Sequence, residues 1–424
     1  MKYVQYKPDI LEKSKRLDFL VIILIFSVYF TILSNVTVAV FCYSMLALVA
    51  LYLISTRRIT LSLTKFEKLF LFFIAASFVW VSITYFINGM PEKGGGWIIR
   101  RQLNVLMVIP IYLMLRGRPI PPNVWWLAIS IGASIVGLVA VFEVDWSQGW
   151  PMGRARGDTN RIFFGEISLC LVFITIIGVK TFFLSNKLKV IFWFSSVFLG
   201  GLAVVLSSAR GAWIPIPFLI VISFWYLSKN VSVYKKILIL VGLIAIPIMM
   251  FQFPYTQAKY HQAEEQLSNY FQRGTIVDSM QDSSIGLRLE AWRLMTITIH
   301  ENPLVGIGIG GFKNEIKHYI NEGITHPSIS LLSHSHNQYV EVAVYSGLIG
   351  LLFYLGILLV PGAIFLGCIK NGTSQNSPYA VSGLLIILAF LMFGMTDLTL
   401  AREVPAMFYG LSISILLSLV NQKK

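Results

Sequence analysis

The chain has 424 residues, of which 56% are hydrophobic and 13% are charged, and its mean hydropathy is +0.72. Soluble globular domains carry roughly 25% charged residues, so this composition excludes an ordinary soluble protein and indicates a membrane protein. The formal net charge is +14, and no nucleic-acid partner is expected for such a chain.

Apolar stretches that are long enough to cross a bilayer as helices, roughly 20 residues each, recur from Phe19 almost to the C-terminus. Twelve are predicted, at about 19–34, 36–55, 66–88, 98–115, 124–143, 161–183, 188–207, 212–228, 235–252, 340–368, 379–396 and 403–420. A transmembrane β-barrel would instead show segments of about ten residues that alternate between apolar and polar, and this pattern is missing from the sequence. The predicted fold class is an all-α polytopic membrane protein.

The first apolar segment lacks an obvious small-residue cleavage site, and another apolar segment follows it at once. It is therefore interpreted as an anchor and not as a signal peptide that is removed. The three cysteines, Cys42, Cys170 and Cys368, lie within or at the ends of apolar segments. Their spacing indicates neither a disulfide framework nor a metal site, so they are interpreted as packing residues.

Basic residues orient the chain, because cytoplasmic loops carry an excess of lysine and arginine. The N-terminus and alternate loops hold Lys2, Lys7, Lys13, Lys15, Arg16, Arg57, Arg58, Lys65, Arg116, Arg118, Lys187, Lys189, Lys229, Lys235, Lys236, Lys370, Lys423 and Lys424. With an even number of spans, both termini are predicted to be cytoplasmic. The predicted organisation is nine transmembrane helices with short loops in 1–252, a large periplasmic loop at 253–336, and three transmembrane helices in 337–424.

The predicted outer side favours arginine over lysine. It holds ten arginines and four lysines: Arg100, Arg101, Arg154, Arg156, Arg161, Arg210, Arg273, Arg288, Arg293 and Arg402 against Lys93, Lys259, Lys313 and Lys317. Topology requires only charge, whereas the planar guanidinium group suits bidentate binding of phosphate or carboxylate. Each arginine alone can also contact lipid headgroups or pair with an acid such as Asp145, Asp158, Glu290 or Asp397. For the group, an anionic ligand on the outer side is the sharper hypothesis.

Two short outer segments carry candidate arginines. The first, GRARGDTNR at 153–161, places Arg154, Arg156 and Arg161 in a glycine-containing loop that can fold around an anion or simply be flexible. The second, SSARGAW at 207–213, places Arg210 in a turn between two apolar spans, with small neighbours that let a ligand approach. An arginine at a membrane boundary is energetically costly unless it is paired, so its position suggests a role.

The stretch GLRLEAWRLMTITIHENP at 286–303 predicts a helix in the long outer loop that ends before proline. One face of this helix carries Arg288, Trp292, Met295 and Ile299. Glu290 and Arg293 are three residues apart and can form an ion pair. Arg288 is therefore the better ligand candidate, and Arg293 is interpreted as a solvated ion-pair partner.

The next motif, GIGIGGF, matches a dinucleotide-binding glycine pattern by spacing alone, through Gly306, Gly308 and Gly311. That fingerprint also needs a strand before it, a helix after it and an acidic residue about twenty positions on. A loop outside a membrane bundle does not provide this context, so the segment is interpreted as a turn.

Four histidines, His318, His326, His334 and His336, fall within nineteen residues near the end of the predicted loop. His334 and His336 are two apart and would point together only on a strand, and no cysteine or carboxylate stands at zinc spacing. No metal site is therefore predicted.

A helix that begins near His336 would place small residues below the histidine in one stripe. These are Val340, Ala343, Gly347 and Gly350. Small residues allow membrane helices to approach closely, which would hold His336 rigidly. A rigid imidazole is a candidate general base, because its ordinary pKa lies near neutral pH. The alternative is that His336 and Asn337 only cap and solvate a helix end.

His336-Asn337, followed after nine residues by Gly347-x-x-Gly350, resembles the His-Asn-x9-Gly-x-x-Gly motif of the O-antigen ligase family. SSARGAW, and GLRLEAW followed by NPLVGIGIGGF, are similar to other recurring stretches of that family. The resemblance covers roughly 200–355. The superfamily also holds O-antigen polymerases, protein O-oligosaccharyltransferases and some proteins once proposed as bicarbonate transporters.

The resemblance implies a GT-C-like helical bundle in the bacterial inner membrane, with its active site facing the periplasm. It implies metal-independent, inverting transfer of glycan from undecaprenyl diphosphate to lipid A–core, without a cofactor. Catalysis would fall to His336, and carrier binding to Arg210 and Arg288. Further substrate-binding candidates are Arg154, Arg156 and Arg161, by charge and side of the membrane, and Asn337, by its place in the motif.

Other functions remain open. A polymerase consumes the same kind of donor but extends a carrier-linked chain, and a protein acceptor is a second variant. An anion transporter would show paired repeats and polar groups near the middle of several spans. Here the middles of the spans are almost uncharged, with Glu166 near an end as an exception, and polar groups gather on one side. A membrane enzyme with an outer site therefore explains the pattern better.

Overall fold

The computed structural model describes residues 8–59, 61–88, 95–147, 153–229, 231–252, parts of 257–268, 284–371 and 377–421. Within these residues the chain forms helices joined by turns and loops, and no β-strand. The all-α fold class predicted from the sequence is confirmed.

The helices follow one another along the whole chain. They are α1 (Pro8–Thr31), α2 (Val36–Ser55), α3 (Lys65–Ile87), α4 (Gly95–Leu106), α5 (Val108–Gly117), α6 (Pro122–Glu143), α7 (Arg161–Ile177), η1 (Gly178–Lys180), η2 (Phe183–Ser185), α8 (Lys187–Ser207), η3 (Arg210–Trp213), α9 (Ile216–Leu227), α10 (Val233–Gln252), α12 (Ser284–Glu301), α13 (Gly311–Asn321), η5 (Pro327–Leu331), α14 (Gln338–Asn371), α15 (Ser377–Phe393) and α16 (Glu403–Val420). Each predicted apolar segment falls on one to three of these helices.

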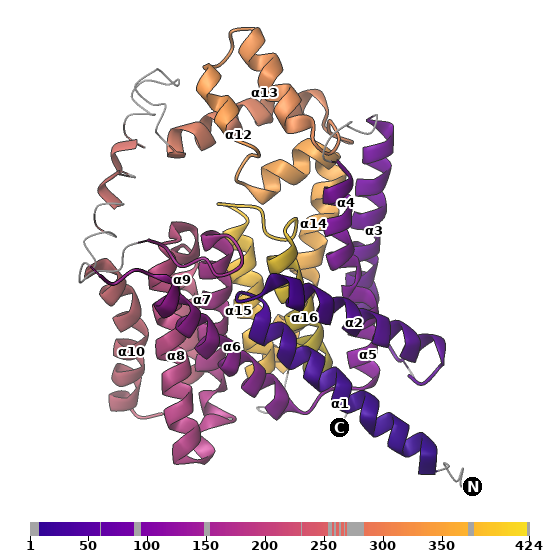
Figure 1. The fold of residues 1–424 in the computed structure, drawn as a ribbon, viewed down its shortest axis with the longest axis vertical. Helices are drawn as coiled ribbons and strands as arrows, with labels where there is room; N and C mark the ends of the chain where they lie inside the picture. The colour runs from indigo at the N-terminus through magenta and orange to yellow at the C-terminus, as the bar shows by residue number, and fades with distance from the viewer. Residues whose placement is uncertain are drawn as a thin grey trace.

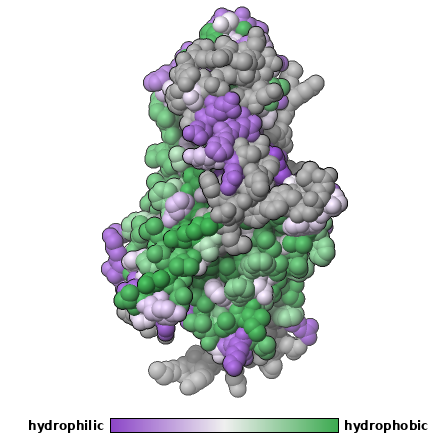
Figure 2. All heavy atoms as spheres, turned by 90° about the vertical axis from the view of Figure 1, so that its left-hand side faces the viewer, coloured by the Kyte–Doolittle hydropathy of each residue, from purple (hydrophilic) through white to green (hydrophobic). Residues whose placement is uncertain are grey.

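Eight helical segments in the described part of the chain are long and apolar enough to cross a membrane: Val36–Ser55, Lys65–Ile87, Pro122–Glu143, Arg161–Lys180, Lys187–Ser207, Arg210–Leu227, Gln338–Asn371 and Glu403–Val420. Helix α15 is apolar but shorter. Figure 2 shows hydrophobic side chains in a broad band over the face in view, with hydrophilic residues above and below it. The chain is a polytopic membrane protein, and the total of twelve spans stays a prediction.

The predicted segment 98–115 is not one helix, because it divides into α4 and α5 at Met107. Pro110 explains the division. Proline has no backbone N–H to donate to the carbonyl of Leu106, and its ring clashes with that carbonyl. Helix α4 packs against α3 and α16, and α5 packs against α2 and α16.

Two apolar cores divide the molecule. The larger one fills the bundle, and the smaller one lies under α12, α13 and η5, which together are called the cap below. The smaller core consists of Leu287, Ala291, Leu294, Met295, Phe312, Ile316, Tyr319, Ile329 and Val344. Figure 1 shows the cap at one end of the bundle, with the start of α1 and the C-terminus toward the other end.

Helix α14 joins the cap to the bundle and is broken at Gly347, whose φ of 67° and ψ of −175° are not helical. The loop after α12 fills the break. Ile307 donates its N–H to the carbonyl of Val344 at 2.8 Å, and Leu348 donates to the carbonyl of Pro303 at 2.8 Å. Trp80 of α3 donates its indole N–H to the carbonyl of Ser346 at 2.8 Å. The backbone groups freed by the break are therefore satisfied, as burial in a membrane bundle requires.

The expected continuous stripe of small residues is therefore wrong at Gly347. A Cβ atom there would collide with the backbone of Leu304, so this glycine admits the loop and not a neighbouring helix. At Gly350 the expectation holds in part, because a Cβ atom would collide first with Ser346 of the same helix and would lie 3.3 Å from Trp80 of α3. The GIGIGGF segment is a turn, as predicted, with positive φ angles at Gly306, Gly308 and Gly310.

Gly347→Ala is predicted to destabilise the protein strongly. The backbone region at Gly347 is essentially restricted to glycine, at a cost of about 1–3 kcal/mol for other residues, and the collision with Leu304 adds to this. A lower melting temperature of the purified protein and a lower amount in the membrane are expected. Gly367→Ala in the same helix is the control, because a Cβ atom there meets nothing within 4 Å. Equal stability of both variants would contradict the prediction.

Candidate functional site

The loop before α14 presents two histidines in a strained backbone. His336 has a φ of 51°, a left-handed conformation that is unfavourable for a residue with a side chain. Neighbouring groups hold it there: Ser335 donates its N–H to the Glu341 carboxylate at 2.8 Å, and Trp292 of the cap donates to the Ser335 carbonyl at 2.8 Å. The turn brings the rings of His334 and His336 to 4.0 Å between centroids, although the segment is not a strand.

A buried carboxylate faces His336. Its Nδ1 lies 3.7 Å from Oδ1 of Asp397, whose side chain is 3% exposed, whereas that of His336 is 20% exposed. The loop that holds Asp397 is fixed to the start of α14 through Gln338. Its N–H donates to the Gly394 carbonyl at 2.7 Å, and its side-chain oxygen accepts the N–H of Thr399 at 2.8 Å. Asp397 is thus positioned to stabilise a positive charge on His336.

The charges in this cluster act on one another. Burial alone would raise the pKa of Asp397, but the adjoining His336 and His334 lower it below its ordinary value. Burial and the neighbouring His336 lower the pKa of His334 to about 3, against a raising effect of Asp397. His334 is therefore neutral near pH 7, which agrees with its Nδ1 accepting the His336 N–H at 3.2 Å.

Two arginines reach the same cluster from different elements. Arg288 of α12 donates to the Thr396 carbonyl at 3.4 Å, beside Asp397. Burial lowers the pKa of Arg288, Asp397 raises it, and the charge of Arg210 lowers it further. Arg210 opens η3, where a Cβ atom at Gly211 would lie 2.7 Å from the Thr396 hydroxyl. The fold therefore brings Arg210, Arg288 and His336 together around the 394–402 loop.

The family comparison covers this region. A family model described as O-antigen ligase matches residues 195–355, which include Arg210, Arg288 and His336. Residues 195–355 belong to the O-antigen ligase family. A similar protein, an uncharacterized protein of Haemophilus influenzae (strain ATCC 51907 / DSM 11121 / KW20 / Rd), is 26% identical over 339 residues, which cover 78% of this chain and 82% of that protein. The O-antigen ligase family consists of membrane enzymes of the glycosyltransferase type, both ligases and polymerases.

Asn337, the second residue of the O-antigen ligase motif, caps α14. Its side-chain oxygen accepts the N–H groups of Tyr339 at 3.0 Å and Val340 at 3.2 Å. This is the capping alternative considered for the sequence, and it commits the oxygen of the amide to the helix. Only its amide NH₂ group remains for a substrate.

The three arginines of the 153–161 segment lie in a neighbouring loop. Arg154 and Arg156 are exposed, and Arg161 begins α7. The side chain of Arg156 is 3.8 Å from the Glu143 carboxylate. Ala155 donates its N–H to the Leu206 carbonyl at 3.0 Å, which ties the loop to the end of α8, shortly before Arg210.

His334, His336 and Asp397 also have a spacing that a metal ion can use, because their ligand atoms lie within 4.8 Å of one another. The positive charges near the cluster argue against a metal site. Arg288 and Arg402 both act on His334 with positive charge, which disfavours a bound cation. The same arrangement suits proton transfer beside an anionic substrate.

The sequence analysis did not assign two carboxylates, Asp397 and Glu166, to this site. Asp397 was considered only as a partner for arginine, although its place after an apolar segment was a usable signal. Glu166 of α7 is 1% exposed, and its two oxygens have no hydrogen-bond partner in the described part of the chain. Its Oε1 lies 3.9 Å from the position of a Cβ atom at Gly211, so it adjoins the arginine end of the site.

The lowered pKa of His334 predicts a pH-dependent stability. An unfolded histidine titrates near pH 6.5, whereas the folded protein holds the pKa of His334 at about 3. Between these values the unfolded chain binds more protons, so stability falls as the pH drops. His334→Gln is expected to show a flatter decline in melting temperature between about pH 7 and pH 5. His300→Gln, at an exposed position of α12, should keep the slope of the wild type.

Proposed function

We propose that this protein is an O-antigen ligase that transfers glycan from undecaprenyl diphosphate to lipid A–core. The proposal places the reaction at the periplasmic side of the bacterial inner membrane, with both termini cytoplasmic. The observation that carries it is the convergence of His336 and Asp397 with Arg210 and Arg288 at the cap end of an apolar bundle. Membership of residues 195–355 in the O-antigen ligase family supports the donor class.

His336 is the proposed general base. The acceptor hydroxyl attacks the anomeric carbon of the donor sugar from the face opposite the diphosphate, and its proton passes to the imidazole. One new bond forms between the acceptor oxygen and the anomeric carbon as the bond to the phosphate oxygen breaks, so the configuration inverts. Asp397, 3.7 Å from Nδ1, stabilises the imidazolium that results.

Arg210 and Arg288 act on the leaving group. The departing diphosphate takes the electron pair of the broken bond, and its oxygens gain negative charge. Guanidinium groups that are already in place stabilise this charge without a metal ion, most effectively where burial excludes water. Arg288 fits this role because it is partly buried and fixed to the Thr396 carbonyl.

The position of the site suits two lipid-anchored substrates. Both the donor and the acceptor carry their reacting sugars just above the membrane surface. The cluster lies between the apolar bundle and the cap, so each substrate can reach it while its lipid stays in the bilayer. A transporter would need polar groups along the middle of the bundle, where the described spans are mostly apolar.

A lipopolysaccharide gel of the host tests the proposal. Deletion of the gene should give bare lipid A–core while long carrier-linked glycan accumulates. Neither His336→Ala nor Arg288→Ala should restore the ladder of glycan-bearing lipopolysaccharide bands, even when the variant protein is present in the membrane at the wild-type amount. Loss of the general base alone, in His336→Ala, lowers the rate by about 10²–10⁴. His318→Ala, at an exposed position of α13, should restore it.

The other patterns on the same gel are informative. A band with one repeat unit would indicate an O-antigen polymerase. An unchanged ladder after deletion would contradict the ligase proposal and direct attention to protein O-glycosylation or anion transport.

Asp397→Asn tests the role of the buried carboxylate. The asparagine keeps the size of the side chain but removes the charge that stabilises the imidazolium. We expect kcat to fall by about 100-fold or more, with a smaller change in the KM for the donor. Asp145→Asn, in an exposed loop, is the control. Equal kcat values for Asp397→Asn and the wild type would remove Asp397 from the mechanism.

A further inference from the structure

A second pair of arginines adjoins the histidines. Arg101 lies on α4, and Arg402 precedes the first residue of α16. The helices α4 and α16 pack against each other, and the two guanidinium groups are close enough for their charges to interact. Glu403 offsets part of this repulsion. Arg402 forms no ion pair among the described residues, and its Nε is buried without a hydrogen-bond partner.

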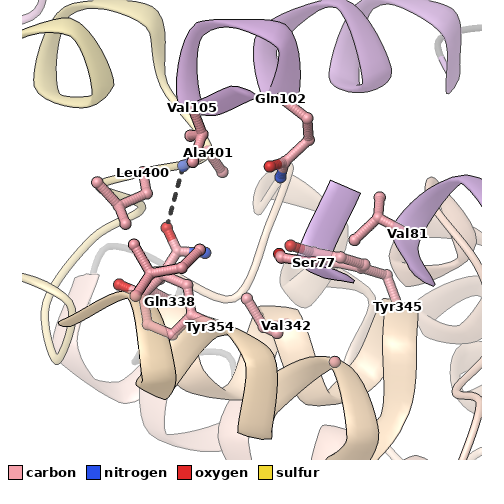
Figure 3. A pocket seen from close by; sticks show the side chains of 12 residues that line it. Ser77, Val81, Gln102, Val105, Gln338, Val342, Tyr345, Tyr354, Leu400 and Ala401 are labelled. Carbon is pink, nitrogen blue, oxygen red and sulfur yellow. Dashed lines mark hydrogen bonds between the residues drawn. The ribbon is translucent and has the colours of Figure 1, made fainter. Parts of the chain in front are cut away.

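The chain neighbours of both arginines share one small cavity. Gln102 and Ala401 line a cavity of about 10 Å³ together with Gln338, which follows the His336-Asn337 motif. Figure 3 shows Gln102 on α4 facing the start of α14, with Ala401 donating its N–H to the Gln338 side chain at 3.4 Å. This packing positions the segments of Arg101 and Arg402 relative to Gln338 and the loop before α14 that holds His336.

The two arginine pairs come from opposite sides of the bundle. Figure 1 shows α4 beside α3 at one side, whereas α8 and α9, which flank Arg210, lie at the other. His334 experiences the charges of both Arg402 and Arg288, so one arginine of each pair lies near the histidine cluster. A diphosphate that occupies the pair of Arg210 and Arg288 does not account for the second pair.

Arg101 and Arg402 are both half-buried, and their like charges repel each other. An anion bound to both would relieve this repulsion. Their planar donors match the oxygens of phosphate. The neighbouring surface is apolar: Phe86 and Ile87 at the end of α3 are 61% and 66% exposed, and Leu103 of α4 is 38% exposed. An anionic headgroup with a lipid tail along α3 and α4 fits this combination.

We propose that Arg101 and Arg402 bind a phosphate group of a lipid-linked acceptor glycan, in a site separate from that of the donor diphosphate. The proposal rests on the proposed function and extends it, because it says how the second substrate is held. The acceptor phosphate would anchor one end of the glycan while its hydroxyl reaches His336. Phosphorylated lipid A–core and a carrier-linked glycan share this chemistry.

Kinetics of the full-length protein in liposomes test the proposal, with each substrate varied at a fixed level of the other. Arg402→Gln and Arg101→Gln should raise the KM for lipid A–core about tenfold, with little change in the KM for the donor. Arg288→Gln should raise the KM for the donor, with little change in the KM for lipid A–core. Arg402→Lys, which keeps the charge, should recover part of the affinity, and Lys317→Gln on α13 is the control for loss of one positive charge.

Lipid A–core whose phosphates have been removed gives the matched substrate control. The wild-type KM for this dephosphorylated acceptor should exceed that for intact lipid A–core by the same factor as Arg402→Gln raises the KM for intact lipid A–core. With the dephosphorylated acceptor, Arg402→Gln should raise the KM no further. An unchanged KM for the phosphorylated acceptor in both arginine variants, at wild-type melting temperature, would overturn the proposal. A raised KM for the donor alone would assign the pair to the donor site and also overturn it.

The result expected if the proposed ligase function is wrong differs from the result expected if only the second binding site is wrong. If the wild type transfers nothing to lipid A–core, the same series is run with a carrier-linked glycan as acceptor. Binding of purified lipid A–core, with and without phosphates, is also measured directly by native mass spectrometry. Phosphate-dependent binding that Arg402→Gln abolishes supports the second site whatever the reaction is, and binding that ignores the phosphates contradicts it.

Discussion

The break in α14 at Gly347 fixes the geometry of the site. Two backbone hydrogen bonds, from Ile307 to Val344 and from Leu348 to Pro303, join the loop after α12 to the two halves of the broken helix. The first residue of α14 follows the motif that holds His336, and α12 holds Arg288. One junction therefore links the segments that hold His336 and Arg288, although the two residues are far apart in the sequence. A flexible loop would not provide such a constraint.

Burial and neighbouring charges then set the protonation states of His334 and Asp397. His334 is kept neutral, so it accepts the backbone N–H of His336 and supports the left-handed turn. Asp397 is kept ionised beside His336 although it is buried. The site thus combines a neutral histidine, an ionised carboxylate and nearby guanidinium groups. The proposed reaction requires such a combination for its anionic substrate and its transient imidazolium. This balance agrees with glycosyl transfer from a diphosphate.

Local features were predictable from the sequence, and long-range contacts were not. The helix at 284–301 and the ion pair between Glu290 and Arg293, at 2.7 Å, follow from helical spacing. The approach of His334 to His336 depends on a φ of 51°, which spacing does not reveal. The meeting of Asp397 with His336 depends on the packing of α14 against the loop before α16. The roles of Arg288 and Arg210 stay predictions. The hydrogen bond of Arg288 to the Thr396 carbonyl and the approach of Gly211 to the Thr396 hydroxyl are tertiary contacts that the sequence does not reveal.

The separate apolar core of the cap bears on how such a protein can diversify. Its side chains pack chiefly on one another and touch α14 through Val344. Substitutions in distant, independent cores affect stability additively, so the cap can change its exposed surface without a penalty in the bundle. Related chains can then differ in the exposed surface of α12, α13 and η5 while the bundle stays the same.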